Sequence, residues 1–480
     1  MPLNEYEAWY HIRYRRTSSA LTTIFLIIAD LLGLLFCFAA GFFFVNLYDL
    51  NLINFKSFVT YWPYLPVFIT IFGFVSLYPG ASLAPAEELR RMTVSSLCIH
   101  GGINFSRYIE DGDFDPITVA FIISFIVSPI VLLSCRSLMR NFLSASRLGG
   151  IPAVIYGGGH TGRAIVDRLL KNKNTGYVPV LILDDSPTEE NQYHGIPIIH
   201  NTTIGPEIVK RLHIKMAIVA MPELNRKALD KLINQSVSAF RYNVVIPDFF
   251  RFTNIWMSVR DFGGILGLAT SYRLNMFWNL WIKRLIDLSI VITGGLLVSP
   301  ILLGIAVLVK ISSPGPVLYS HERLGKNGKH FRAYKFRSMV LDADTKLQHL
   351  LDTNPKALKE WEESHKLKND PRITGIGKFL RRTSIDELPQ LINILKGEMS
   401  LVGPRPIVDS EVKKYGEYFQ KVFSIKPGLT GLWQVSGRSD TGYTDRVSFD
   451  TYYLQSWSVW LDLWIIYKTA GVIFRGSGAY

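Results

Sequence analysis

Residues 18–48 form a long apolar run that only Asp30 interrupts, and this run limits what the chain can fold into. A stretch of that length exceeds the roughly 20 residues that an α-helix needs to cross a bilayer. Further apolar segments cover residues 58–79, 92–106 and 116–135. The sequence therefore predicts that the first domain, residues 1–148, is a membrane-embedded α-helical bundle with four spans.

The positions of the basic residues orient these segments. Cytoplasmic loops of membrane proteins carry an excess of lysine and arginine. Arginines precede the first segment, separate the second from the third and follow the fourth, whereas the intervening loops contain few basic residues. The segment at 92–106 is short and partly polar, but we count it because this alternation requires an even number of spans. Both ends of the bundle are then expected in the cytoplasm.

The composition agrees with a membrane protein and argues against a nucleic-acid-binding protein. Charged residues make up 19% of the chain, below the roughly 25% of soluble domains. The net charge is +13, but the basic residues lie beside apolar segments and we find no nucleic-acid-binding motif. The three cysteines lie in apolar segments and predict neither a disulfide framework nor a metal cluster: Cys37, Cys98 and Cys135.

Residues 149–273 are predicted to form a Rossmann-like α/β domain followed by a linker. A short apolar strand leads into Gly157, Gly159 and Gly162, which fit the pattern G-x-G-x-x-G at the start of an amphipathic helix. A second strand, 178–183, ends in two aspartates about 20 residues later, as in dinucleotide-binding domains. The glycines would let a pyrophosphate approach backbone amides at the helix N-terminus.

Three roles remain open for this domain: a structural or regulatory role, sensing of a nucleotide or sugar nucleotide, and catalysis. An oxidoreductase or sugar dehydratase of this kind would usually need a Tyr-x-x-x-Lys pair. None of the tyrosines in and around the domain has a lysine four residues later. Fold alone does not determine function, so the glycine motif supports the fold better than it supports a bound cofactor.

A further apolar run, 288–309, is predicted to enter the membrane and return to the same side. Ser299 and Pro300 lie at its centre, and proline removes a helical hydrogen bond and bends the chain. Basic residues flank both ends, which therefore favour the cytoplasmic side: Lys283, Arg284 and Lys310. A re-entrant helix near 286–310 that breaks at this Ser-Pro pair satisfies the pattern, and an ordinary kinked span is the alternative.

The basic segment 321–339 contains two candidate phosphate-binding residues. If the segment forms a strand, Lys335 and Arg337 point to the same face, because side chains alternate along a strand. Two neighbouring cations suit a diphosphate, since arginine offers a planar fork of donors and lysine a point charge. A basic patch at the membrane surface is the alternative for this stretch.

An acidic pair, Asp386 and Glu387, is the strongest candidate for catalysis. Proline is tolerated in the first turn of a helix, so Pro389 predicts a helix from about Ser384, with Ser384 and Glu387 forming a capping box. The helix dipole would favour negative charge there, and an aspartate can attack a phosphoryl group. Acidic pairs also occur at ordinary helix starts, so the surrounding motifs decide.

Several motifs occur in order around this pair and together carry a family resemblance. They are Lys335-Phe336-Arg337-Ser338-Met339, Asp386-Glu387-Leu388-Pro389, Gly403-Pro404-Arg405-Pro406 and Lys426-Pro427-Gly428-Leu429-Thr430-Gly431. With their surroundings, from about Lys283 to Tyr480, they resemble the monotopic polyprenyl-phosphate hexose-1-phosphate transferases of bacteria. The resemblance implies a third domain, residues 274–480, which is an α/β-type monotopic catalytic domain with the re-entrant membrane helix.

The resemblance also implies the roles of individual residues. Asp386 would attack the β-phosphate of a UDP-hexose, release UMP and pass the phospho-sugar to undecaprenyl phosphate. Glu387 would hold Mg²⁺ together with Asp386, Arg381 would bind phosphate, and Arg405 would contact the nucleotide. The reaction would be the first membrane step of O-antigen, capsule or exopolysaccharide synthesis, with the active site at the cytoplasmic face of the bacterial inner membrane.

UDP-galactose is the expected donor by resemblance, and UDP-glucose is the runner-up. The membrane is an expected partner and nucleic acid is not, while the oligomeric state is left open with a homodimer as one form. Two functions of other classes remain: a nucleotide-sugar oxidoreductase or dehydratase that uses the Rossmann-like domain, and a non-catalytic membrane scaffold. Release of UMP and the requirement for Asp386 distinguish the transferase from both.

Overall fold

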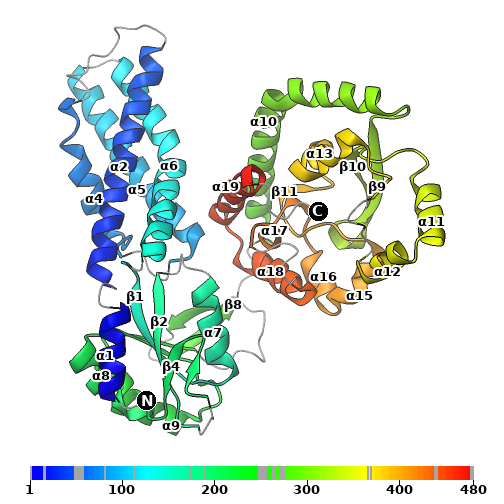
Figure 1. Ribbon diagram of the computed structural model, residues 1–480. Helices are drawn as coiled ribbons and strands as arrows, with labels where there is room; N and C mark the ends of the chain where they lie inside the picture. The colour runs from blue at the N-terminus through cyan, green and yellow to red at the C-terminus, as the bar shows by residue number, and fades with distance from the viewer. Residues whose placement is uncertain are drawn as a thin grey trace. The chain divides into compact units, whose positions relative to one another are not determined.

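The computed structural model describes residues 3–14, 18–47, 59–79, 83–111, 115–146, 148–171, 176–186, 190–246, 257–261, 266–270, 274, 276–364, 367, 370–436 and 442–475. The chain divides into two compact units, residues 1–253 and 254–480 (Figure 1). The first unit contains a helical bundle and an α/β domain, and the second contains the segment with the acidic pair.

Helices that lie side by side form the bundle of the first unit (Figure 1). They are α2 (Ser19–Asn46), α4 (Tyr64–Phe74), α5 (Pro85–Asp111) and α6 (Pro116–Ser146). Phe38 of α2, Phe68 of α4, Met92 of α5 and Phe121 of α6 are buried in one shared apolar cluster. The predicted segments therefore form a single bundle, and the third is longer than the expected 92–106.

The lengths and compositions of these helices differ. Among the described helices, three are long and apolar enough to cross a membrane: α2, α6 and, in the second unit, α10 (Phe277–Ser312). Helix α4 is apolar but has 11 residues, and α5 carries charged residues at both ends. Length and composition alone therefore do not establish the second and third spans that the sequence predicts.

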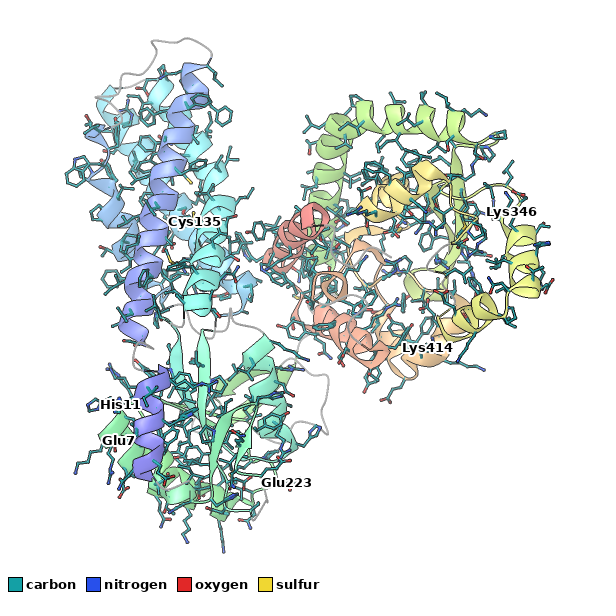
Figure 2. The ribbon with its side chains drawn as sticks, in the orientation of Figure 1. Glu7, His11, Cys135, Glu223, Lys346 and Lys414 are labelled. Carbon is teal, nitrogen blue, oxygen red and sulfur yellow. The ribbon has the colours of Figure 1, made fainter. Side chains whose placement is uncertain are left out.

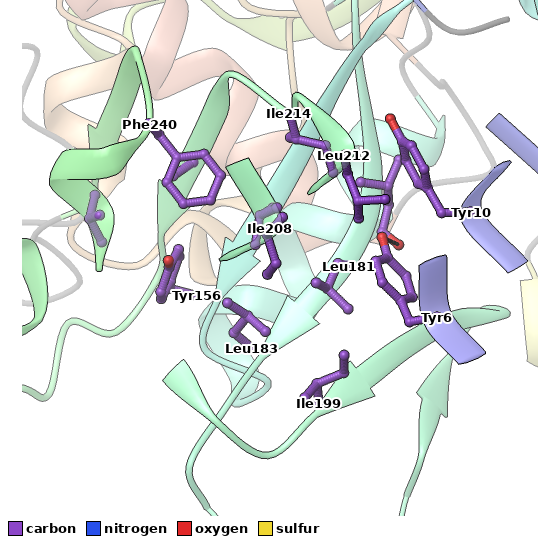
Figure 3. Packing of buried hydrophobic residues seen from close by; sticks show 14 of the residues in the cluster. Tyr6, Tyr10, Tyr156, Leu181, Leu183, Ile199, Ile208, Leu212, Ile214 and Phe240 are labelled. Carbon is purple, nitrogen blue, oxygen red and sulfur yellow. Dashed lines mark hydrogen bonds between the residues drawn. The ribbon is translucent and has the colours of Figure 1, made fainter. Parts of the chain in front are cut away.

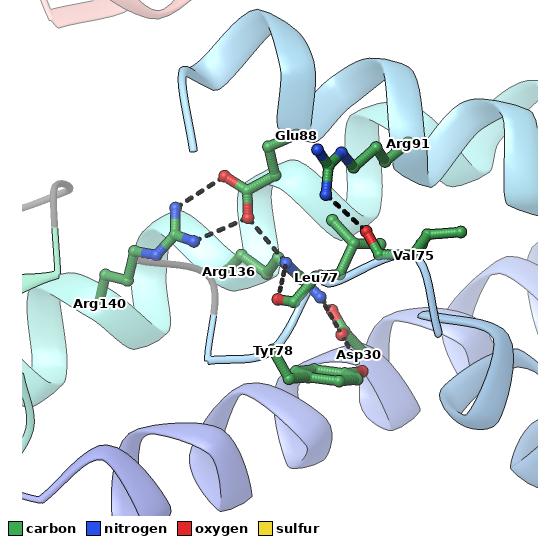
Figure 4. A network of polar contacts seen from close by, with 8 residues as sticks. All are labelled: Asp30, Val75, Leu77, Tyr78, Glu88, Arg91, Arg136 and Arg140. Atoms are coloured by element: carbon green, nitrogen blue, oxygen red, sulfur yellow. Dashed lines mark hydrogen bonds and ion pairs between the residues drawn. The ribbon is translucent and has the colours of Figure 1, made fainter. Parts of the chain in front are cut away.

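Asp30, which interrupts the first apolar run, belongs to a buried network of charges (Figure 4). Arg136 donates to its two carboxylate oxygens at 2.8 and 2.6 Å and to Glu88 at 2.7 Å. Arg140 also binds Glu88, at 2.7 and 2.8 Å, and Tyr78 donates to Asp30. The network joins α2, α5 and α6, and its two guanidinium groups balance its two carboxylates.

The α/β domain confirms the predicted Rossmann-like fold. Its sheet has the order β3-β4-β2-β1-β5-β6, in which all neighbours pair in parallel except β3 and β4. The strands are β1 (Ile151–Tyr156), β2 (Tyr177–Leu183), β3 (Gln192–Tyr193), β4 (Ile196–Ile199), β5 (Met216–Val219) and β6 (Tyr242–Val245). The helical segments of the domain are α7 (His160–Lys171), η2 (Thr202–Ile204), α8 (Gly205–Leu212), α9 (Arg226–Gln235) and η3 (Val237–Ala239).

Helix α1 (Leu3–Tyr14) packs on this α/β domain. Tyr6 and Tyr10 are buried in the core of the α/β domain (Figure 3). The Tyr6 hydroxyl donates to the carbonyl of Val180 at 3.2 Å. Glu7 and His11 lie on the outer side of the helix (Figure 2). The sequence assigns these residues to the first domain, 1–148, whereas in the structure two tyrosines four residues apart on one helical face are buried against the sheet.

The second unit combines small sheets with short helices. Its antiparallel pairs are β7 (Met257–Asp261) with β8 (Leu266–Thr270), inside the expected linker, and β9 (Leu318–Leu324) with β10 (His330–Phe336). Strands β11 (Ser400–Val402) and β12 (Gly428–Thr430) pair in parallel. After α10 the helical segments are η6 (Lys326–Gly328), α11 (Ala343–Thr353), α12 (Pro355–Ser364), α13 (Gly375–Thr383), η7 (Ile385–Gln390), α14 (Leu391–Lys396), η8 (Asp409–Glu411), α15 (Val412–Tyr415), α16 (Tyr418–Val422), α17 (Leu432–Ser436), α18 (Tyr443–Ser456) and α19 (Val459–Arg475).

Helix α10 stays helical through Ser299 and Pro300 but is bent (Figure 1). Proline has no N–H to donate to the carbonyl four residues before it. The Ser299 hydroxyl instead donates to that carbonyl, of Leu296, at 2.8 Å. A side chain therefore replaces the lost backbone hydrogen bond, which lets the helix bend at a point where its apolar side chains are exposed.

Both arms of α10 return to the same body of the second unit. Val291, in the first arm, packs with Phe331 and Ile394. Val309, in the second arm, packs with Phe336 and, through one shared cluster, with Leu380 of α13. A straight helix of 36 residues would be about 54 Å long, so the bend is what brings both ends onto one small domain.

Candidate active site

The β9–β10 hairpin supplies one wall of the candidate site. Its burial pattern alternates along His330–Phe336, so that Phe331 and Ala333 face inward. Near the end of the strand, Lys335 reaches Glu387, and its ammonium lies 2.7 Å from a carboxylate oxygen. The predicted strand is confirmed, and it brings a cation directly to the acidic pair.

The segment that carries the acidic pair differs locally from the expectation. Helix α13 ends at Thr383, and the next residue, Ser384, has a φ of 56° that turns the chain out of the helix. Asp386 and Glu387 lie at the start of the 3₁₀ helix η7, and Pro389 lies inside it. Ser384 makes no side-chain cap, so the predicted capping box is wrong: its left-handed backbone ends one helix before η7 begins.

The two carboxylates have different surroundings. The side chain of Glu387 is 18% exposed and binds both Lys335, at 2.7 Å, and Arg405, at 3.4 Å. Asp386 is 9% exposed. Burial raises the pKa of Asp386 above its ordinary value, with Lys335 and Arg381 lowering that pKa and Glu387 raising it. Asp386 is thus a poorly solvated carboxylate held beside several charged groups.

A polar cavity of about 230 Å³ opens next to Glu387. Glu387, Lys335 and Arg405 line it, as do three charged residues that the sequence did not single out: Arg323, Glu411 and Arg446. The six residues come from several segments, and the first and last of them, Arg323 and Arg446, lie more than 100 positions apart in the chain. Four cations face two carboxylates, so the cavity carries an excess of positive charge.

Arg323 differs from the other three cations of this cavity in its ion pairing. Lys335 and Arg405 pair with Glu387, and Arg446 pairs with Glu411 at 3.2 Å. Among the described residues, no carboxylate pairs with Arg323. Burial lowers the pKa of Arg323, and the neighbouring Arg405 lowers it further. Two arginines that repel each other in a half-buried cavity suit an anionic ligand.

The other two predicted phosphate-binding arginines lie outside the lining of this cavity. Arg381 donates to the Ser338 hydroxyl at 2.9 Å, and its charge interacts with that of Asp386. Arg337 is buried, and its guanidinium donates to the carbonyls of Pro314 and Ser313 just after α10. The expectation that Arg337 joins Lys335 at a diphosphate is therefore corrected, because its donors hold backbone carbonyls instead.

The glycine motif of the α/β domain has the geometry of a tight strand-to-helix turn. Gly157 has φ of +106°, and a Cβ on Gly162 would lie 1.8 Å from the carbonyl oxygen of Gly157. A Cβ on Gly159 would meet nothing within 4 Å. The amide of Gly158 donates to Asp184, at the end of β2. The prediction of a nucleotide site at Gly157, Gly159 and Gly162 stays a prediction.

Similarity to known proteins covers both units. Residues 278–476 match a family model described as bacterial sugar transferase, and residues 84–240 match one described as a CoA-binding domain. The chain is 36% identical to the undecaprenyl-phosphate galactose phosphotransferase of Salmonella typhimurium over 348 aligned residues. The aligned residues make up 72% of each of the two chains. The chain belongs to the bacterial sugar transferase family.

Other bacterial sugar transferases match different parts of the chain. The UDP-glucose:undecaprenyl-phosphate glucose-1-phosphate transferase of Escherichia coli is 30% identical over 405 residues, or 82% of each chain. The exopolysaccharide production protein ExoY of Rhizobium meliloti is 47% identical over 198 residues, or 41% of this chain and 88% of that one. This bacterial sugar transferase is therefore a phosphoglycosyl transferase, and its apolar helices make it a bacterial membrane protein.

Proposed function

We propose that the protein transfers a hexose-1-phosphate from a UDP-sugar to undecaprenyl phosphate through a phospho-sugar carried on Asp386. The observation that carries the proposal is the setting of the acidic pair. Glu387 lines a cavity with four cations, and Asp386 lies buried beside it. A diphosphate in this cavity would meet positive charge and a carboxylate nucleophile together. The reaction would open O-antigen, capsule or exopolysaccharide synthesis.

UDP-galactose is the donor that we propose, with UDP-glucose as the runner-up. The relative from Salmonella typhimurium is named for galactose, and the relative from Escherichia coli is named for glucose. The first is 36% identical and the second 30% identical, but over stretches of different length. An enzymatic test of this preference compares the two donors directly.

The chemistry requires two displacements at the same phosphorus. In the first, a carboxylate oxygen of Asp386 bonds to the β-phosphorus, and the bond to the bridging oxygen breaks, so UMP leaves with that oxygen. In the second, a phosphate oxygen of undecaprenyl phosphate bonds to this phosphorus and the bond to Asp386 breaks. Lys335 and Arg405 would stabilise the charge on the phosphates, because charge-assisted hydrogen bonds are the strong ones.

The acidic pair also fits a magnesium ion, but only together with the substrate. Mg²⁺ prefers oxygen ligands and is usually held by one or two carboxylates plus substrate phosphates. Among the described residues, no group of three or more metal-binding side chains is found, whereas Asp386 and Glu387 offer two adjacent carboxylates. When bound, the ion would neutralise charge on the diphosphate. We propose these two residues as its protein ligands.

The membrane topology that we propose has four spans and a re-entrant α10, with domain limits near residues 148 and 273. Support for the spans comes from the shared core of α2, α4, α5 and α6 and from the arginines on one side of the bundle. Support for the re-entrant helix comes from its bend and from its two arms, which pack on one domain. The active site would then face the cytoplasm at the inner membrane.

Cysteine labelling tests this topology. A chain without its native cysteines would carry one new cysteine, at Met276 before α10 or at Ser312 at its end, both of which are exposed. An impermeant thiol reagent should label both positions from the cytoplasmic side of sealed vesicles. A straight transmembrane α10 would place the two on opposite sides, and labelling of one from each side would refute the re-entrant helix.

The enzymatic test uses the purified full chain with Mg²⁺ and either UDP-galactose or UDP-glucose. Without acceptor, intact-mass measurement should find one hexose-phosphate on the wild-type chain and none on Asp386→Asn, since an amide cannot attack phosphorus. The matched control is Asp445→Asn, an exposed aspartate of the same unit, which should keep the adduct. With undecaprenyl phosphate, UMP should be released in proportion to lipid-linked product.

Two results would overturn the proposal. Release of UDP in place of UMP would indicate that the sugar alone is transferred. An Asp386→Asn chain that still turns over donor at the wild-type rate would remove the proposed nucleophile. The donor that forms the adduct faster identifies the preferred hexose, and equal rates would reject the preference for galactose.

A further inference from the structure

Two cations meet at the end of α14 that lies away from the acidic pair. A Cβ built on Gly397, the residue after α14, would lie 3.4 Å from the Lys426 ammonium and 3.7 Å from a guanidinium nitrogen of Arg284. Two positive groups therefore lie within 4 Å of a single point. Neither residue lines the cavity beside Glu387.

The charged groups of Arg284 and Lys426 differ in their hydrogen-bond partners. The guanidinium of Arg284 donates to the carbonyls of Ile394 and Leu395, at 2.6 and 3.0 Å, and so caps the last turn of α14. The ammonium of Lys426 makes no hydrogen bond or ion pair among the described residues. A structural role thus explains Arg284, but it leaves the neighbouring ammonium without a partner.

The surroundings of Lys426 are unfavourable to its charge. Burial lowers the pKa of Lys426, and the charges of Arg284 and Lys326 lower it further. Asp287 acts in the opposite direction, but its carboxylate is held by the Ser400 hydroxyl at 2.7 Å and by the amide of Leu401. A half-buried group of like charges remains stable when an anion is bound beside it.

The position of Arg284 along α10 indicates which kind of anion can reach it. Before it, Trp278 and Trp281 are exposed, and aromatic side chains of this type favour the membrane interface. After it, Leu285 is exposed and lies just before the apolar run 288–309 that we propose to enter the bilayer. Arg284 therefore marks the level of the lipid headgroups, where phosphate is the abundant anion.

We propose that Arg284 and Lys426 form a binding site for the phosphate group of an anionic lipid. The inference rests on the proposed seating of α10 in the inner leaflet. Helix α14 has six residues and is about 9 Å long, so a phosphate bound here lies one short helix away from η7. The site is separate from the cavity that would hold the donor diphosphate.

Either of two lipid phosphates could occupy this site. A phospholipid such as phosphatidylglycerol presents a phosphodiester with one negative charge, and it would anchor the domain at a fixed depth. Undecaprenyl phosphate presents a phosphomonoester with up to two charges, and it would wait there before it reaches Asp386. Both satisfy the same pair of cations, so the experiment must separate them.

The test measures lipid binding to the purified full chain in detergent by native mass spectrometry. The probes are dioleoylphosphatidylglycerol, undecaprenyl phosphate and, as a neutral control, dioleoylphosphatidylcholine. Lys426→Gln should weaken retention of the anionic lipid about fivefold, and Lys426→Arg should restore it. Lys421→Gln removes an exposed lysine on α16 of the same unit and should leave retention unchanged.

The outcomes identify the lipid or reject the site. A Lys426-dependent signal with phosphatidylglycerol assigns a structural lipid, and one with undecaprenyl phosphate alone assigns the acceptor. Equal retention by the wild type, Lys426→Gln and Lys421→Gln would overturn the proposal, provided that circular dichroism shows each variant folded. Binding is measured without donor, so failure of the transferase proposal would appear separately, as a missing adduct on Asp386.

Discussion

Replacing Arg136 with methionine should destabilise the helical bundle by about 3–5 kcal/mol. The side chain is fully buried and binds Asp30 at 2.8 and 2.6 Å and Glu88 at 2.7 Å. Methionine would fill much of the space but leave two carboxylates without this cation. Glu88 keeps Arg140, whereas Asp30 keeps only the hydroxyl of Tyr78 among the partners described above. Most of the lost stability should therefore come from the Asp30 carboxylate, which would stay buried without a cation.

The substitutions at Arg136 and Asp30 should be strongly coupled in their effect on stability. If the cost of Arg136→Met is the uncompensated charge of Asp30, then Asp30→Asn in the same chain should remove most of it. We expect a coupling energy of about 2 kcal/mol or more between the two substitutions. The matched control is Arg90→Met, which removes an exposed arginine paired with Glu87 at 2.8 Å. A surface pair of this kind contributes about 0–1 kcal/mol.

Cys37 provides a probe for the bundle alone. It is buried in α2, so a thiol reagent can reach it only when the bundle opens. With Cys98 and Cys135 replaced by serine, Arg136→Met should raise the rate of Cys37 labelling about 100-fold or more. Arg90→Met should change this rate by less than about fivefold.

Two outcomes would refute the view that Arg136→Met destabilises the bundle by leaving the Asp30 carboxylate without a cation. Labelling of Cys37 in the Arg136→Met chain at the Arg90→Met rate would show that the network contributes nothing measurable. A double variant with Asp30→Asn that opens as fast as Arg136→Met alone would mean that lost packing, and not the stranded carboxylate, destabilises the bundle.

Three other results are expected. Arg323→Ala should slow UMP release at low donor concentration about tenfold or more, because a charge-assisted contact to phosphate is lost. The control is Arg332→Ala, which changes an exposed residue of β10 and should leave the rate of UMP release unchanged. Gly162→Ala should destabilise the α/β domain by about 1–3 kcal/mol or more in urea unfolding, because the new Cβ would overlap the carbonyl oxygen of Gly157. Gly159→Ala should leave the stability of the domain unchanged, because a Cβ there would meet no atom within 4 Å. Chelation of Mg²⁺ should stop adduct formation, and added Mg²⁺ should restore it.

The parts of the fold that the sequence predicted are those with local periodicity. The strands near 152–156 and 178–183 and the glycine turn between them were predictable, because a buried parallel strand is an apolar run and the close approach at Gly162 admits no side chain. The break at Ser299-Pro300 was predictable for a similar reason, since proline lacks the donor that a helix needs. Each of these features depends on neighbours in the chain.

The parts that the sequence missed depend on residues far apart in the chain. Arg323, Glu411 and Arg446 meet Glu387 in one cavity, and no spacing in the sequence connects them. Arg337 has the same charge and the same predicted face as Lys335, but the chain after α10 passes beside it and takes its hydrogen bonds. In each case tertiary packing, which a single sequence does not display, decides what a charged side chain binds.

The two arms of α10 explain how a membrane helix can position a catalytic carboxylate. Asp386 lies on η7, between α13 and α14. The second arm packs on α13 through Val309 and Leu380, and the first arm packs on α14 through Val291 and Ile394. Because packed interiors transmit displacement rather than absorb it, any change in the depth of α10 would move both helices that flank the carboxylate. An acceptor whose phosphate is confined to the headgroup layer can reach Asp386 only at one height, and the bent helix that we propose to enter the inner leaflet is the element that would set this height.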